Sequence, residues 1–127
     1  MNNQDKAKNA IKWIDGLLKT RVKQGIEELG DSSLGYCCLG YGCKVLGLDY
    51  DPRGETSKSF SDSVGLMDES GLFEESEIGA NDLTQLNDDI GYSFNKIAKF
   101  IKANANELFE KEVAKQIINH YQKEITS

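Results

Sequence analysis

The stretch YCCLGYGCKVLGL, residues 36–48, is the most apolar part of the chain and contains all three of its cysteines. Its apolar residues follow neither the two-residue period of a half-buried strand nor the one-sided stripe of a surface helix. Apolar side chains all round are typical of a helix buried at the centre of a domain. Gly40 and Gly42 lack a Cβ atom, so we expect neighbouring elements to approach this helix closely there. A buried strand is the alternative, which the two glycines disfavour.

A helix is predicted before this central segment, over residues 3–20. Its buried stripe repeats at helical spacing and consists of Ala7, Ile11, Ile14 and Leu18, and Trp13 and Leu17 widen that stripe. A second short helical stretch is predicted over residues 22–29, with Gly30 in the position that follows a helix end. Residues 31–33, Asp-Ser-Ser, suit a turn or a helix cap.

Two helices are predicted towards the C-terminus. Ser93 is a suitable N-cap for the first, whose apolar face consists of Phe94, Ile97, Ala98 and Ile101. Residues 104–106, Asn-Ala-Asn, interrupt the pattern. The last helix is expected over residues 107–124, with a buried side that consists of Leu108, Phe109, Val113, Ile117, Ile118, Tyr121 and Ile125.

The middle of the chain, residues 49–90, is acidic. It contains 12 carboxylates against two basic residues, whereas the rest of the chain contains 9 acidic and 13 basic residues. Its glycines and single proline favour an extended segment with short strands or a hairpin around residues 57–64 and 71–77. Residues 83–86 suit a helical turn and residues 87–91 a tight turn. The whole chain, residues 1–127, is therefore predicted to form a single α+β domain that is predominantly helical.

Composition and charge exclude several classes of function. A net charge of −6 with only local basic clusters argues against binding to duplex DNA or RNA. The chain has no apolar run long enough to cross a membrane, so no membrane association is expected. The first ten residues lack the apolar region of a secretion signal, and an odd number of cysteines suits a reducing cytoplasm.

The cysteines are predicted to be core thiols. A structural zinc site needs four ligands in paired spacing, and a cysteine nucleophile would need His120, the only histidine, as its base. Asp88 and Asp89 could hold a divalent cation, but turn formation and helix capping explain them without chemistry. No phosphate-binding loop, dinucleotide motif or hydrolase motif is present. We therefore expect neither enzyme activity nor a metal or cofactor.

The start of the helix after residue 92 is the strongest candidate for a ligand site. Backbone N–H groups at a helix start bind phosphate, and Tyr92 could present its ring to a nucleobase. Lys96 lies one turn further on. Lys96, Lys99 and Lys102 form a row at helical spacing. This row could hold one small anion, or it could form a solvated helix face.

Three blocks of the sequence resemble a widespread group of small proteins encoded by tailed bacteriophages. Residues 18–25, LKTRVKQG, are similar to an L-R-S-G-x-Y-x-Q-G segment, although the glycine and the tyrosine are missing. YCCLG at residues 36–40, followed by Cys43, resembles Y-C-C-L-G-x-L-C. Residues 83–101 resemble L-x-x-L-N-D…S-F-x-x-I-A-x-x-I. In this chain an acidic segment replaces the aromatic-rich middle of the group.

The group is similar to the phage anti-CBASS sponge proteins, which bind cyclic nucleotide signals of bacterial defence systems and sequester them without cleavage. The resemblance implies a cyclic di- or oligonucleotide as the ligand, a homo-oligomer, and the cytoplasm of an infected bacterial host. Cationic residues and backbone amides would contact phosphates, a tyrosine would stack on a base, and amide side chains would read base edges. The residues expected to bind the ligand are Arg21, Lys23, Gln24, Tyr36, Asn87, Tyr92, Ser93 and Lys96. The alternative is an interaction module that inhibits a host or defence protein through the acidic residues 49–90.

Overall fold

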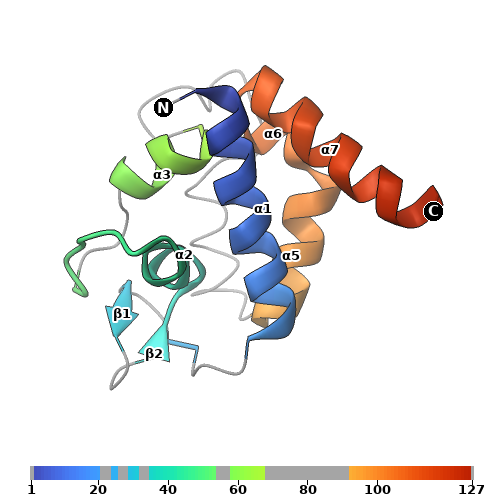
Figure 1. Cartoon of the computed structure of the whole chain (residues 1–127). Coiled ribbons are helices and arrows are strands. Elements are labelled where there is room, and N and C mark those ends of the chain that lie inside the picture. The colour runs from blue at the N-terminus through green and yellow to red at the C-terminus, as the bar shows by residue number, and fades with distance from the viewer. Residues whose placement is uncertain are drawn as a thin grey trace.

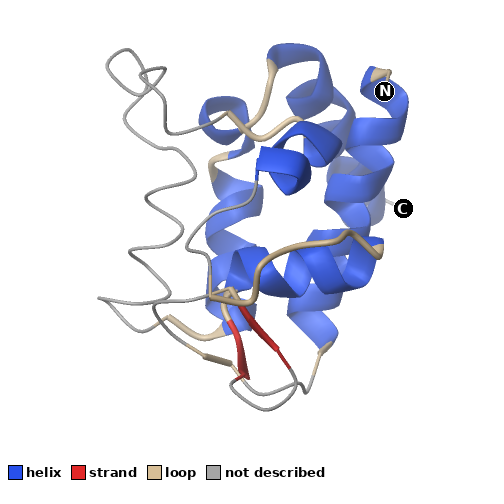
Figure 2. Ribbon diagram, turned by 90° about the vertical axis from the view of Figure 1, so that its left-hand side faces the viewer, coloured by secondary structure: helices blue, strands red, loops and turns tan. Residues whose placement is uncertain are grey.

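The computed structural model describes residues 2–20, 24–25, 29–31, 35–53, 58–67 and 92–126. The described residues form a predominantly helical body with one short pair of strands at its lower end (Figure 1 and Figure 2). The elements are α1 (Asn3–Lys19), β1 (Gly30–Asp31), β2 (Gly35–Tyr36), α2 (Cys38–Leu46), α3 (Lys58–Val64), α5 (Phe94–Ala103), α6 (Ala105–Leu108) and α7 (Lys111–Thr126). None of the described helices combines the length and the apolarity needed to cross a membrane.

Helix α1 runs through the middle of the molecule, with α2 and α3 to one side of it and α5 and α7 to the other (Figure 1). Its start is capped by Asn2, whose side-chain oxygen accepts a hydrogen bond of 2.8 Å from the Asp5 amide. The helix predicted over residues 3–20 is therefore confirmed. Its buried face consists of Ala7, Ala10, Trp13, Ile14 and Leu17, while Ile11 and Leu18 of the predicted stripe are half-buried.

Trp13 joins three helices in the core. Its side chain is fully buried, and its indole Nε1 donates a hydrogen bond of 2.9 Å to the carbonyl oxygen of Cys38 at the start of α2. Its ring also meets the ring of Phe60, on α3, edge to face, with the ring centroids 4.8 Å apart. The position of α1 thereby determines the positions of both α2 and α3.

Helix α2 is the central buried helix that its composition predicts. Its first six residues are all buried, and the Cys37 sulfur caps its start by accepting a hydrogen bond of 3.4 Å from the Gly40 amide. A Cβ atom at Gly40 would collide with the backbone carbonyl of Leu29, and one at Gly42 would collide with the ring of Phe60. The close approach expected at both glycines is confirmed.

Two predictions about the chain between α1 and α5 are wrong. Residues 58–64, expected as a strand or hairpin, form α3, because Phe60 and Val64 lie four residues apart and bury the same face of a helix against α1. The helix expected over residues 22–29 is absent where that stretch is described. Gln24 forms a parallel bridge with Tyr36, and the backbone N–H of Gly25 donates to the Tyr36 carbonyl at 2.7 Å.

The start of β1 lies at Gly30, which has a positive φ of 87° and pairs with Tyr36 in β2. The sequence predicts that this glycine follows a helix end, whereas in the structure it begins a strand. The elements predicted at residues 71–77, 83–86 and 87–91 lie outside the described residues.

The C-terminal part is confirmed in outline and differs in one boundary. Helix α5 begins after Ser93 as predicted, but the last helix does not run unbroken from residue 107. Short helix α6 ends at Leu108, Phe109 bridges Leu66, and α7 begins at Lys111. The backbone of residues 65–67 causes this break, because its hydrogen bonds to Leu108 and Glu110, each 2.8 Å long, replace helical ones.

The packing at Gly40 yields a stability prediction. We expect Gly40→Ala to lower the free energy of unfolding by about 2–3 kcal/mol or more, since the added methyl meets a backbone carbonyl that cannot rotate away. Lys44→Ala, on the exposed face of the same helix, is the control and should change stability by about 0.5 kcal/mol or less. Urea denaturation measures both, and equal stability of the two variants would contradict the packing described here.

Candidate functional site

The start of α5 is built as the sequence predicts. Ser93 has extended backbone angles, and its hydroxyl oxygen accepts a hydrogen bond of 3.3 Å from the Lys96 amide. The first bond within the helix runs from the Ile97 amide to the Ser93 carbonyl at 2.9 Å. The amides of Phe94 and Asn95 therefore precede the intrahelical hydrogen bonds and lie at the positive end of the helix dipole.

Gln24 reaches this helix start from a distant part of the sequence. Its side-chain Nε2 donates a hydrogen bond of 2.7 Å to the carbonyl oxygen of Tyr92, 68 residues away. The bridge between Gln24 and Tyr36 fixes the same residue to β2. The structure thus brings two of the predicted ligand residues together. It also gives the Gln24 amide nitrogen a structural role, since that group holds the backbone at residue 92.

Tyr92 and Lys96 form the chemically distinctive pair at this place. The Tyr92 side chain is half-buried, Lys96 is exposed, and the Lys96 ammonium lies 4.3 Å from the centroid of the Tyr92 ring. Such a cation–π contact contributes about 0.5–1 kcal/mol at an exposed site. We call the four residues assembled here, Gln24, Tyr92, Ser93 and Lys96, the α5 corner.

The remaining predicted residues are not part of the described corner. Tyr36 belongs to the core and is only 7% exposed, which leaves little of its ring accessible, and its stacking on a ligand stays a prediction. Its neighbours include Lys44, whose ammonium lies 5.9 Å from the ring centroid. Arg21, Lys23 and Asn87 lie outside the described residues, so their roles stay predictions.

The lysines at the two ends of the row on α5 face different partners. Lys96 faces Tyr92 at the start of the helix, whereas Lys102 faces Tyr121 of α7 near the end, again 4.3 Å from the ring centroid. Six residues of helix separate the two lysines by about 9 Å along the axis. The row therefore serves two separate places, each with its own tyrosine.

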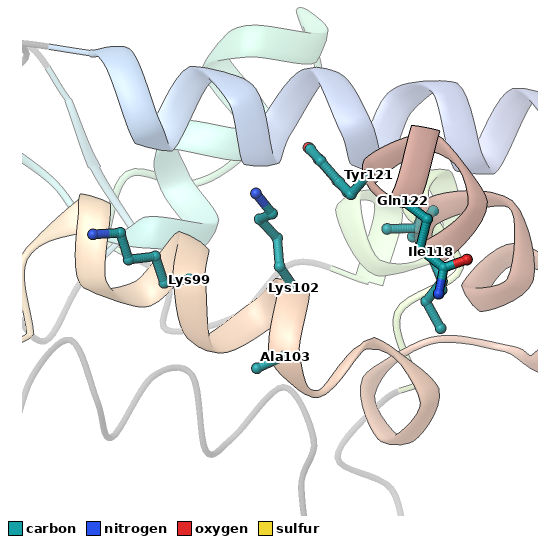
Figure 3. A pocket seen from close by; sticks show the side chains of 7 residues that line it. Lys99, Lys102, Ala103, Ile118, Tyr121 and Gln122 are labelled. Atoms are coloured by element: carbon teal, nitrogen blue, oxygen red, sulfur yellow. The ribbon is translucent and has the colours of Figure 1, made fainter. Parts of the chain in front are cut away.

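The second of these places is a groove between α5 and α7 with a volume of about 370 Å³ (Figure 3). Its apolar lining consists of Ala103, Ile117, Ile118 and Tyr121, and its polar lining of Lys99, Lys102 and Gln122. We call it the α5–α7 groove. The sequence signal for it is the adjacent pair Ile117 and Ile118, which makes the apolar side of α7 wider than one buried stripe requires.

The structure describes all three cysteines but only a few of the acidic residues between positions 49 and 90. Cys37, Cys38 and Cys43 are at most 2% exposed, which confirms the core assignment. Within the described ranges, no three His, Cys, Asp or Glu side chains cluster closely enough to hold a metal ion. Asp88 and Asp89 lie outside these ranges, as does most of the acidic segment proposed as a protein-binding surface.

A second hollow, of about 340 Å³, lies between α1 and α7. His120 lines it together with Lys8, Ile11 and three amide side chains, those of Gln4, Gln116 and Asn119. The cysteines belong to α2 and its cap, so the only histidine of the chain and the thiols occupy different parts of the fold.

Comparison of this chain with models of protein families, with curated proteins and with solved structures finds no match. The resemblance to phage proteins therefore rests on the sequence blocks themselves.

The burial of the thiols can be tested directly. In the native protein we expect all three to react slowly with Ellman's reagent, because the reagent cannot reach sulfur atoms inside the core. In guanidinium chloride all three should react at once, which provides the internal control. Rapid reaction of one thiol in the folded protein would show an accessible cysteine and would reopen the question of cysteine chemistry.

Proposed function

We propose that this chain binds a cyclic nucleotide at the α5 corner and sequesters it without cleavage, as a homo-oligomer in the cytoplasm of an infected bacterium. The observation that carries the proposal is the Lys96 ammonium held 4.3 Å from the Tyr92 ring at the start of a ten-residue helix. A cation beside helix-start amides suits a phosphate, and an adjacent aromatic ring suits a base. The sequence blocks support the ligand class, the sequestering role and the oligomer.

To bind a phosphate, Lys96 would exchange its contact with the Tyr92 ring for a hydrogen bond to a phosphate oxygen. Moving the Lys96 ammonium off the Tyr92 ring forfeits about 0.5–1 kcal/mol. A hydrogen bond from an ammonium to a phosphate oxygen contributes about 1.5–3 kcal/mol. The exchange is favourable, and the Phe94 and Asn95 amides add two donors beside it.

The base would stack on the ring that the lysine leaves. The Gln24 hydrogen bond to the Tyr92 carbonyl holds this residue in place before a ligand arrives, so little ordering entropy opposes binding. Stacking of one base on an aromatic side chain contributes about 1–3 kcal/mol. Lys23 directly precedes Gln24 in the sequence, and with Arg21 and Asn87 it is proposed to complete the ligand contacts.

The binding experiment uses the purified full-length chain with cyclic dinucleotides, cyclic trinucleotides and cyclic ADP-ribose isomers. Thermal shift identifies a stabilising ligand, and chromatography of the supernatant after heat denaturation shows whether that ligand is intact. Recovery of intact nucleotide is the expected result. A cleaved product would contradict sequestration, and no stabilisation across the panel would favour the alternative of an acidic protein-binding module.

The site residues are tested with the ligand so identified. Tyr92→Ala and Lys96→Ala should each weaken binding by about tenfold or more, through loss of the stacking surface and of the phosphate contact. Lys8→Ala is the matched control, since it removes the same charge from an exposed position in the N-terminal half of α1, away from the α5 corner. Melting temperatures should stay within about 3 °C of the parent. Unchanged affinity in both site variants, measured by calorimetry, would overturn the assignment.

A further inference from the structure

The α5–α7 groove has the properties of a ligand site that is separate from the α5 corner. Its volume of about 370 Å³ falls within the range of small-molecule pockets, which is roughly 300–1,000 Å³. Neither Tyr92 nor Lys96 lines it. Figure 3 shows Lys99 and Lys102 projecting from α5, with Ile118, Tyr121 and Gln122 on the facing helix.

The floor of the groove is apolar and rigidly held. Ile117 and Tyr121 are almost completely buried at its base, and Ile118 is half-buried. The Tyr121 hydroxyl donates a hydrogen bond of 2.8 Å to the Asp15 carboxylate on α1, which fixes the ring from behind. An apolar ligand group entering the groove would therefore meet a preformed surface.

Both charged side chains in the described lining of the groove are positive. Two lysines border the apolar floor, and the described lining contains no carboxylate. The Lys102 ammonium lies over the Tyr121 ring, 4.3 Å from its centroid, a contact that it can exchange for a stronger one with an anion. The groove thus complements a molecule that combines an apolar body with a negative charge.

We propose that the α5–α7 groove binds a small amphiphilic anion, such as a carboxylate with an aliphatic chain. The chain lies on Ile117, Ile118 and Tyr121, and the carboxylate accepts hydrogen bonds from Lys102 and Lys99. This site is separate from the nucleotide site, because none of its lining residues belongs to the α5 corner.

The test uses decanoate as the probe, with decanol and acetate as its separate apolar and anionic halves. Chemical shift changes of the full-length, isotope-labelled protein give both the affinity and the location. Decanoate should shift amides in the last turn of α5 and around residues 117–122. Decanol and acetate should each bind at least about tenfold more weakly than decanoate. Equal binding of decanol and decanoate would overturn the role of the charge.

Three variants separate a built site from general charge and from self-association. Lys102→Gln should weaken decanoate about tenfold and leave decanol unchanged, while Lys12→Gln, which removes the same charge from an exposed position on α1, should change neither. Equal loss in the two lysine variants would overturn the proposal.

The third variant, Ile118→Glu, should abolish decanoate binding. If sedimentation shows instead that Ile118→Glu dissociates a dimer of the parent protein, a second copy occupies the groove and the proposal is wrong.

Discussion

The hydrogen bond from the Trp13 indole to the Cys38 carbonyl is the contact on which the remaining structure depends. An indole has one donor, and burying it without an acceptor is costly, so α1 and the start of α2 are held at one distance and one angle. The same ring packs edge to face against Phe60 and so places α3 as well. With these three helices fixed, the glycines of α2 meet Leu29 and Phe60 at distances that no other residue allows.

The packing of α1 against α2 also fixes the positions of the residues in the α5 corner. The buried Cys37 amide donates to the Leu29 carbonyl at 3.1 Å, and β2 precedes it directly. Gln24 bridges β2 at Tyr36 and then reaches the Tyr92 carbonyl, which connects the core to the start of α5. Asn95 completes the connection with a hydrogen bond of 3.4 Å to the Leu18 carbonyl at the end of α1. The α5 corner is therefore a consequence of the helix packing and not an independent loop.

Helix α5 carries two lysine–tyrosine pairs. One face of the helix buries Phe94, Ile97, Ala98 and Ile101. Lys96 and Lys102 each lie over a tyrosine ring, and the two rings come from different places in the chain. An ammonium on an aromatic ring is only weakly held and can move to a stronger anionic partner. The proposed nucleotide site and the proposed amphiphile site rest on this same physical property at opposite ends of one helix.

The elements whose apolar residues repeat over several turns could be predicted from the sequence. The N-terminal helix, the buried glycine-rich helix and the Ser93-capped helix followed from spacing, composition and one capping residue. The short elements depend on tertiary contacts. Two apolar residues, Phe60 and Val64, are too few to show a helical period in the sequence, and they form a buried helix face only by packing against α1. The backbone of residues 65–67 interrupts the last helix through hydrogen bonds that local sequence does not predict. Tertiary structure also decided which candidate residues meet. Local spacing carries no information on a contact such as Gln24 with Tyr92, 68 residues apart, or on the burial of Tyr36, since both depend on how separate helices pack.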